Sequence, residues 1–160
     1  MTKDETYAFL KKAGAPFEAI EHKAVFTVEQ SEALNLPHPE AKAKNIFLKC
    51  GKQGWCLVTL GADKRLDTKA FKKAHGFKSV SFASPEDLMA KLSLIPGEVT
   101  PLGLLNTDDT SIALFIDEAF LGGLISVHPN DNSASVFLKT SDLVRLIKKH
   151  GNAVSFFKAP

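Results

Sequence analysis

The sequence AKNIFLKCGKQGWCLVTL, residues 43–60, decides the fold. Its two apolar runs, 45–48 and 55–60, flank the turn Gly51-Lys52-Gln53-Gly54, and this pattern predicts a β-hairpin. Cys50 and Cys56 stand on either side of the turn, so we expect them to be neighbours across the hairpin. Two cysteines in a chain without signs of secretion predict reduced thiols rather than a disulfide.

At the start of this hairpin, Lys44 and Asn45 put a cation and an amide at the mouth of an apolar strand. Strand ends next to loops hold side chains rigidly and are places where charges are aimed into clefts. The alternative is that Lys44 only solvates the strand end, as most exposed lysines do.

Helices and strands are predicted to follow one another irregularly around the hairpin. Thr2-Lys3-Asp4-Glu5 and Thr27-Val28-Glu29-Gln30 are typical of capping boxes that begin helices. Further helices are predicted from Asp67 to His75, from Ser84 onward and over 141–150, and further strands over 17–20, 112–116, 125–127, 135–138 and 154–157. This order predicts an α+β fold rather than a doubly wound one, in a single domain spanning residues 1–160.

The segment Pro96-Gly97-Glu98-Val99-Thr100-Pro101-Leu102-Gly103 is the first candidate ligand loop. Its prolines and glycines cannot continue a helix or a central strand, and the apolar residues on both sides predict that it is pinned on the core. Glycine has no Cβ, so the Gly97 N–H can approach a ligand closely. A plain structural turn is the alternative.

The segment Val127-His128-Pro129-Asn130-Asp131-Asn132-Ser133 is the second candidate loop. His128 at a strand end is a candidate hydrogen-bonding group or proton carrier. The alternative is hairpin turn chemistry with a structurally satisfied histidine. No second histidine or acidic partner lies at metal-ligand spacing, so we expect neither a metal nor a cofactor.

Composition restricts the class of partner. The chain has 20 Lys and Arg against 18 Asp and Glu, and its net charge of +2 gives no strong basic field. The lysines are nevertheless dense between residues 42 and 78. We see no signal peptide and no apolar run long enough to cross a bilayer, and we therefore expect a cytoplasmic protein with no membrane partner.

Taken together and in this order, these motifs resemble the YbaK/prolyl-tRNA synthetase-associated editing domains. The likeness rests on Lys44-Asn45 opening an apolar strand, on the Gly97-x-x-x-Pro101 loop and on His128-Pro-Asn-Asp-Asn before a strand. It extends over nearly the whole chain and is closest to the free-standing branch that deacylates alanyl-tRNA(Pro). It implies a mixed, strongly curved, barrel-like sheet surrounded by helices.

The resemblance also implies an activity. Trans-editing hydrolysis of mischarged tRNA(Pro) is expected, with alanyl-tRNA(Pro) as substrate, water as nucleophile and a transient association with prolyl-tRNA synthetase. Lys44 would hold the terminal phosphate or the ester region, and the Gly97 N–H would stabilise the oxyanion. Asn45 and His128 would orient the substrate, with proton transfer as a second role for His128.

The remaining candidate residues would bind the substrate. They are Val25, Phe26, Thr27, Ile46, Pro101 and Asn130. Val25, Phe26, Ile46 and Phe47 are candidate walls of a pocket small enough to exclude proline. Core packing is the alternative for these four, and we expect it for at least two of them.

Two other functions stay open at this point. The first is the same chemistry on cysteinyl-tRNA(Pro) or another mischarged tRNA. The second is a non-catalytic module that binds an amino acid or aminoacyl-tRNA.

Overall fold

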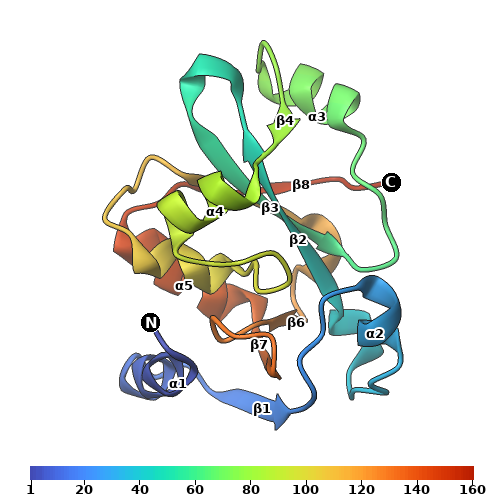
Figure 1. Cartoon of the computed structure of the whole chain (residues 1–160), viewed down its shortest axis with the longest axis vertical. Coiled ribbons are helices and arrows are strands. Elements are labelled where there is room, and N and C mark those ends of the chain that lie inside the picture. The colour runs from blue at the N-terminus through green and yellow to red at the C-terminus, as the bar shows by residue number, and fades with distance from the viewer.

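Two separate β-sheets form the framework of the chain (Figure 1). The computed structural model describes the backbone of residues 1–160 and every side chain except those of Val28 and Gln53. The smaller sheet is antiparallel and has the order β1-β7-β6, with β1 at Phe17–Glu21, β7 at Ala134–Lys139 and β6 at Leu124–Val127.

The larger sheet is mixed and has the order β4-β2-β3-β5-β8. Its strands are β4 (Ser81–Phe82), β2 (Ala43–Lys49), β3 (Trp55–Gly61), β5 (Ala113–Asp117) and β8 (Val154–Phe157). The predicted hairpin is confirmed, since β2 and β3 pair antiparallel along their whole length. The pairs β3–β5 and β5–β8 are parallel, so the mixed sheet that the resemblance implied is confirmed, although local patterns did not indicate which strands are parallel.

The expected barrel-like sheet is wrong, whereas the α+β class is confirmed. In a closed barrel every strand has a neighbour on both sides. Here four strands, β1, β6, β4 and β8, each end a sheet, and no hydrogen-bonded strand pair joins the two sheets in the described backbone. β4, at one of these edges, is only two residues long, and so short an edge strand offers little backbone for pairing with another chain.

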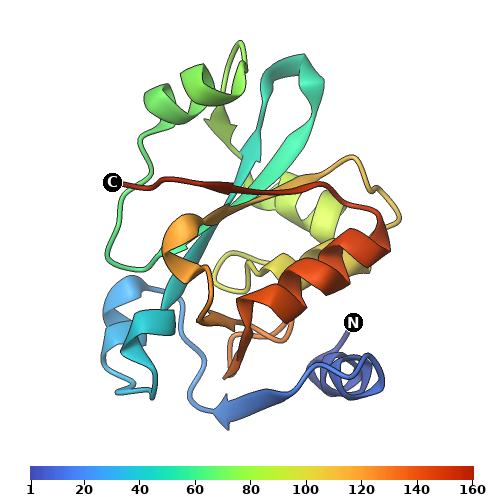
Figure 2. The same ribbon diagram turned by 180° about the vertical axis from the view of Figure 1, so that it is seen from behind.

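The main core lies on one face of the larger sheet. It includes Leu57 and Leu114 from that sheet, Leu138 from the smaller sheet and Ile147 from the helix α5 (Thr140–His150). A second cluster covers the opposite face and includes Leu48, Cys56, Val58 and Phe71. Because β3 is buried on both faces, it reads as a continuous apolar run rather than as an alternating one. Figure 2 shows α5 and β8 crossing the far side of the molecule.

Four of the five helices begin at the predicted caps, whereas α5 begins after Lys139 without a side-chain cap. The helices are α1 (Lys3–Lys12), α2 (Val28–Glu32), α3 (Thr68–His75), α4 (Pro85–Leu92) and α5. The capping box of α1 is complete, because Thr2 and Glu5 exchange side-chain to backbone hydrogen bonds. That of α2 is only half made: Thr27 caps the Gln30 N–H, but Gln30 accepts from the Phe26 N–H instead of Thr27. α3 and α4 begin at the side-chain caps of Asp67 and Ser84.

The two cysteines are neighbours at the hairpin end, as predicted. Both are buried free thiols, and their Sγ atoms lie 3.1 Å apart. Burial raises the pKa of both thiols, so neither is a ready nucleophile.

A buried carboxylate ties the end of β3 to β5. Asp117 Oδ2 accepts from the Gly61 N–H at 3.1 Å and from Lys64 Nζ at 2.7 Å, and Oδ1 accepts from the Ala119 N–H at 3.0 Å. Burial alone would raise the pKa of Asp117, but the hydrogen bonds from Lys64, Ala119 and Gly61 outweigh it, so the pKa lies below its ordinary value. This contact positions the turn at 61–64, which borders the site described below.

We expect Asp117→Asn to lower the free energy of unfolding at neutral pH by about 2 kcal/mol, since bonds to a charged acceptor are lost. The folded pKa is lowered, so the stabilisation is present above the unfolded-state pKa of about 3.9 and disappears as the pH falls through the folded value. Urea unfolding of both proteins should therefore show a difference that shrinks below about pH 4. A difference that stays constant to low pH would contradict the assignment.

Candidate active site

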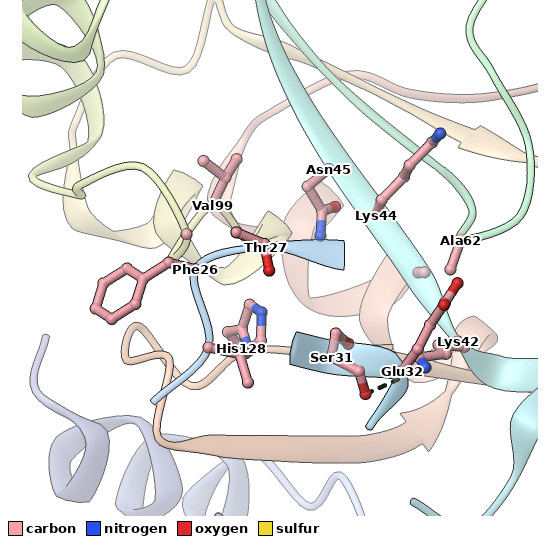
Figure 3. Close-up of a pocket in the computed structure, with 13 residues that line it drawn as sticks. Phe26, Thr27, Ser31, Glu32, Lys42, Lys44, Asn45, Ala62, Val99 and His128 are labelled. Carbon is pink, nitrogen blue, oxygen red and sulfur yellow. Dashed lines mark hydrogen bonds between the residues drawn. The ribbon is translucent and has the colours of Figure 1, made fainter. Parts of the chain in front are cut away.

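A small cavity lies at the beginning of β2, between the larger sheet and the loop that precedes α2 (Figure 3). Its volume is about 180 Å³, below the roughly 300–1,000 Å³ that is usual for small-molecule pockets. Its lining comes from five separate segments: Val25, Phe26, Thr27, Ser31, Glu32, Lys42, Ala43, Lys44, Asn45, Ala62, Gly97, Val99 and His128. Seven of the sequence-predicted residues are therefore brought together here.

Lys44 and Asn45 both border the cavity but point to opposite sides of β2. Neighbouring side chains on a strand alternate between faces, and the register pairs Asn45 with Thr59 and Lys44 with Leu60. The fully buried Thr59 donates a 2.6 Å hydrogen bond from Oγ1 to Asn45 Oδ1, which leaves the amide N–H groups of Asn45 for the cavity. Figure 3 shows the ammonium of Lys44 extending away from Thr27 and His128. Lys44 is therefore a cation at the edge of the site.

His128 enters from the smaller sheet, just after β6. Its Nδ1 lies 3.1 Å from the Ala134 carbonyl oxygen, which can only accept, so Nδ1 carries the proton. Burial lowers the pKa of His128, which favours the neutral ring. Nε2 is then a hydrogen-bond acceptor. In Figure 3 the side chains of His128, Thr27 and Asn45 point toward the same space.

The wall made by Val25 and Phe26 is held by Asn132. The Asn132 amide donates to the Val25 carbonyl at 3.0 Å, and the Val25 N–H donates back to the Asn132 carbonyl at 3.3 Å. Asn132 is buried, and so is Val25, whereas Phe26 is 60% exposed at the rim. The polar end of the His128 loop thus serves to position the apolar wall.

Lys42 fixes α2 against the strand. Its Nζ lies 3.3 Å from the Ser31 carbonyl oxygen in the last turn of that helix (Figure 3). The same carbonyl accepts from the Leu34 N–H at 3.2 Å, so Lys42 adds a second donor at the C-terminal end of the helix, where a cation is favourable. Ser31 and Glu32 are thereby kept at the cavity edge.

Four predicted residues lie outside the cavity. Ile46 packs against the second apolar cluster and Phe47 lies in the main core, where it stacks on Trp55, so these two candidate walls are core residues. Pro101 is buried at the start of the 3₁₀ helix Pro101–Asn106. Asn130 is 9% exposed and bonds to Thr6 and Asn106, which makes it a structural residue.

Gly97 lies in the cavity wall with φ of +93°, a conformation that side chains rarely adopt. A Cβ here would stand 3.2 Å from Phe26 Cδ1 and 3.3 Å from the Val25 carbonyl oxygen. The backbone therefore requires a glycine here, as the structural-turn alternative predicts, and the ligand role of Gly97 stays a prediction. No acceptor for the Gly97 N–H is present among the described groups of the protein.

Thr59, Asn132 and Val99 belong to the site but were missed from the sequence. Thr59 lies in an apolar strand and Asn132 lies in a turn-forming run. A threonine in a strand and an asparagine in a turn are both ordinary, so neither residue indicated a site. The register of β2 and β3 could have indicated Thr59, because it lies opposite Asn45 in the hairpin.

Two negative findings apply to the described residues. No group of three or more His, Cys, Asp or Glu side chains among them is arranged to hold a metal ion. None of the helices described combines the length and the apolar character needed to cross a membrane.

Comparisons with known proteins agree with one another. A model of the aminoacyl-tRNA editing domain matches residues 22–146. Prolyl-tRNA editing protein ProX of Acetoanaerobium sticklandii is 34% identical over 160 residues, covering 98% of this chain and 95% of that protein. Prolyl-tRNA synthetase associated domain-containing protein 1 of Bos taurus is 34% identical over 145 residues, covering 84% and 82%.

The fold is also found among solved structures. A crystal structure described as a candidate trans-editing enzyme for prolyl tRNA synthetase matches with a TM-score of 0.74 and 20% identity, covering 99% of this chain and 97% of that one. At this identity the match establishes the fold alone.

We expect Gly97→Ala to destabilise the protein by more than about 1 kcal/mol, because positive φ and contact with the Val25–Phe26 wall both oppose a side chain. Gly122→Ala is the matched control: its φ is +75°, but nothing lies within 4 Å of the added Cβ. Thermal and urea unfolding should show the larger loss for Gly97→Ala. Equal losses would mean that the wall contact contributes nothing.

Proposed function

Because the chain belongs to the aminoacyl-tRNA editing domain family, we propose that it hydrolyses the ester of tRNA(Pro) charged with a wrong amino acid, and that this amino acid is alanine. Identity over nearly the full length with a prolyl-tRNA editing protein is the observation that carries the proposal. The enzyme would act in trans in the cytoplasm, with a transient association with prolyl-tRNA synthetase. It would need no metal or cofactor.

The size of the cavity supports a small aminoacyl group. About 180 Å³ leaves room for the acyl part of the substrate, while the adenosine and its phosphate would lie outside. Val25, Val99 and Phe26 form its apolar part. One methylene is worth only about 1–3 kcal/mol of discrimination, so a rigid wall is needed to separate alanine from proline. The paired hydrogen bonds of Val25 with Asn132 supply that rigidity.

Hydrolysis requires a water molecule to attack the ester carbonyl carbon and the resulting oxyanion to be stabilised. Collapse of the tetrahedral intermediate releases the ribose hydroxyl and the free amino acid. The Gly97 N–H, which has no protein acceptor among the described groups, is the proposed donor to the oxyanion. One such donor can be worth about 2.7–4 kcal/mol in the transition state. The family resemblance implies that the 2′-hydroxyl of the terminal adenosine activates the water.

The polar residues have distinct proposed roles. The neutral His128 offers Nε2 as an acceptor to the substrate's ammonium or ribose hydroxyl, and the Asn45 amide offers donors to an oxygen. His128 is thus an orienting group, and proton transfer is its second possible role. Lys44, which points away from these groups, suits the terminal phosphate rather than the ester carbonyl.

Cysteinyl-tRNA(Pro) is the second candidate substrate, because cysteine adds a single sulfur atom to the alanine side chain and an apolar pocket discriminates only weakly against so small a change. The non-catalytic binding module is the alternative from another class. It would keep the cavity but show no turnover.

The decisive experiment incubates the purified protein with alanyl-, cysteinyl- and prolyl-tRNA(Pro) in the presence of EDTA. We expect alanyl-tRNA(Pro) to lose its amino acid and prolyl-tRNA(Pro) to remain charged, because in this proposal the Val25–Phe26 wall accepts a methyl group and opposes the larger ring. Persistence of all three esters at stoichiometric enzyme would favour the binding module. Faster loss of cysteine than of alanine would change the substrate, and activity restored only by added zinc would overturn the metal-free mechanism.

Lys44→Ala should abolish most of the activity while leaving the thermal midpoint nearly unchanged. Its ammonium makes no ion pair with any described carboxylate, and surface substitutions of this kind usually change stability by less than about 0.5 kcal/mol. Lys11→Ala, on the exposed face of α1, is the control for loss of one charge. Unchanged deacylation would refute the anchoring role, and a large loss of stability would point to a structural one.

A further inference from the structure

A second cavity, lined by lysines, lies at the other end of β2. It has a volume of about 630 Å³ and is formed between the tip of the β2–β3 hairpin and the segment that leads into β4. Its lining residues are Lys49, Cys50, Gly51, Lys52, Lys78, Ser79 and Ser81. None of them is acidic, and the proposed hydrolysis does not use them. We call it the lysine groove.

Two contacts fix the position of the hairpin tip relative to the segment before β4. Gly51 has φ of +60°, and a Cβ on it would stand only 3.0 Å from Ser79 Oγ, so the hairpin tip packs closely on the second segment. Two residues before Gly51 and two residues after Ser79, β2 and β4 pair, with Lys49 opposite Ser81. The two segments therefore keep Lys52 and Lys78 on opposite sides of the same groove.

The positive charge of the groove is not neutralised within the protein. Lys49, Lys52 and Lys78 are exposed, and none forms an ion pair with a carboxylate in the described part of the chain. Lys49 Nζ also lies 5.7 Å from the ring centroid of Trp55, and Lys91 Nζ lies at the same distance from that ring. Clustered cations without counter-charges raise the local concentration of anions and attract polyanions.

We propose that the lysine groove binds backbone phosphates of the acceptor stem of the RNA whose charged end occupies the cavity at Lys44. This inference rests on the proposed function. β2 joins the two places directly: the five residue steps from Lys44 to Lys49 span about 17 Å at the rise of a strand. Taking the B-form spacing of about 3.4 Å per phosphate along one strand as a rough scale, this distance corresponds to about five nucleotide steps, which places the groove within reach of phosphates near the charged end.

The position of the groove explains how a chain with a net charge of only +2 can hold a nucleic acid. Lysine contacts to phosphates supply affinity and register without reading bases. The aminoacyl ester would bind in the cavity, and the phosphates of the acceptor stem would bind at the hairpin tip. Short substrates that lack the stem would lose only the second contact.

The test measures binding of an uncharged, fluorescently labelled acceptor-stem minihelix, so it does not depend on hydrolysis. In the triple variant Lys49→Ala, Lys52→Ala, Lys78→Ala we expect about 10- to 100-fold weaker binding near 50 mM salt. The slope of the logarithm of the binding constant against the logarithm of the salt concentration should decrease in magnitude by about two. The matched control removes three exposed lysines of α1 and α5 that lie outside the groove, with Lys12→Ala, Lys148→Ala and Lys149→Ala. It should change the affinity less than about threefold.

Deacylation assays separate this proposal from the proposed function. The triple variant should show a raised KM on alanylated minihelix with kcat retained, and unchanged hydrolysis of alanyl-adenosine, which has no stem. If the wild-type protein hydrolyses neither substrate, the proposed function fails while minihelix binding still decides the groove. Lys52→Glu alone, at the exposed hairpin tip, provides a second variant if the triple variant does not fold. Wild-type affinity in both variants, or an equal loss in the control, would overturn the proposal.

Discussion

The pairing of β2 with β3 is the constraint on which the candidate site depends. The register places Asn45 opposite Thr59, and the buried hydroxyl of Thr59 holds the amide of Asn45. Because side chains alternate along a strand, the same register sends Lys44 to the other side. β2 also has β4 on its second edge, so its backbone cannot shift without breaking hydrogen bonds on both sides. A single strand therefore sets the directions of the orienting amide and of the cation.

The second requirement is that the smaller sheet approaches the start of β2. His128 follows β6, and the loop after it carries Asn132, which holds the wall at Val25 through two hydrogen bonds. A buried amide that loses its partner costs about 1–3 kcal/mol, so this wall is expected to be well defined. The positive φ of Gly97 lets the opposite loop come close to that wall. Three of the five segments that line the small cavity, those of Val25, Gly97 and His128, are thus positioned by these contacts.

The charges of the protein divide into two classes with different roles. Lys64 is paired with the buried Asp117 and holds the turn beside the site. Lys44, together with the lysines at the hairpin tip, has no carboxylate partner among the described side chains. Paired charges stabilise the fold, whereas free ones remain available to a polyanionic ligand. The small net charge of the whole chain hides this distribution.

Local patterns in the sequence determined the helix caps, the β2–β3 hairpin, most strands and the α+β class, because each depends on residues close together in the chain. They also indicated Lys44, Asn45, Gly97 and His128. Only the tertiary structure decided that the sheets stay open, that β3, β5 and β8 run parallel, that Ile46 and Phe47 are core residues and that Asn132, not Asn130, supports the cavity. Those outcomes depend on contacts between segments far apart in sequence. Strand order, side-chain direction and the partner of a buried amide are fixed only when such segments pack together.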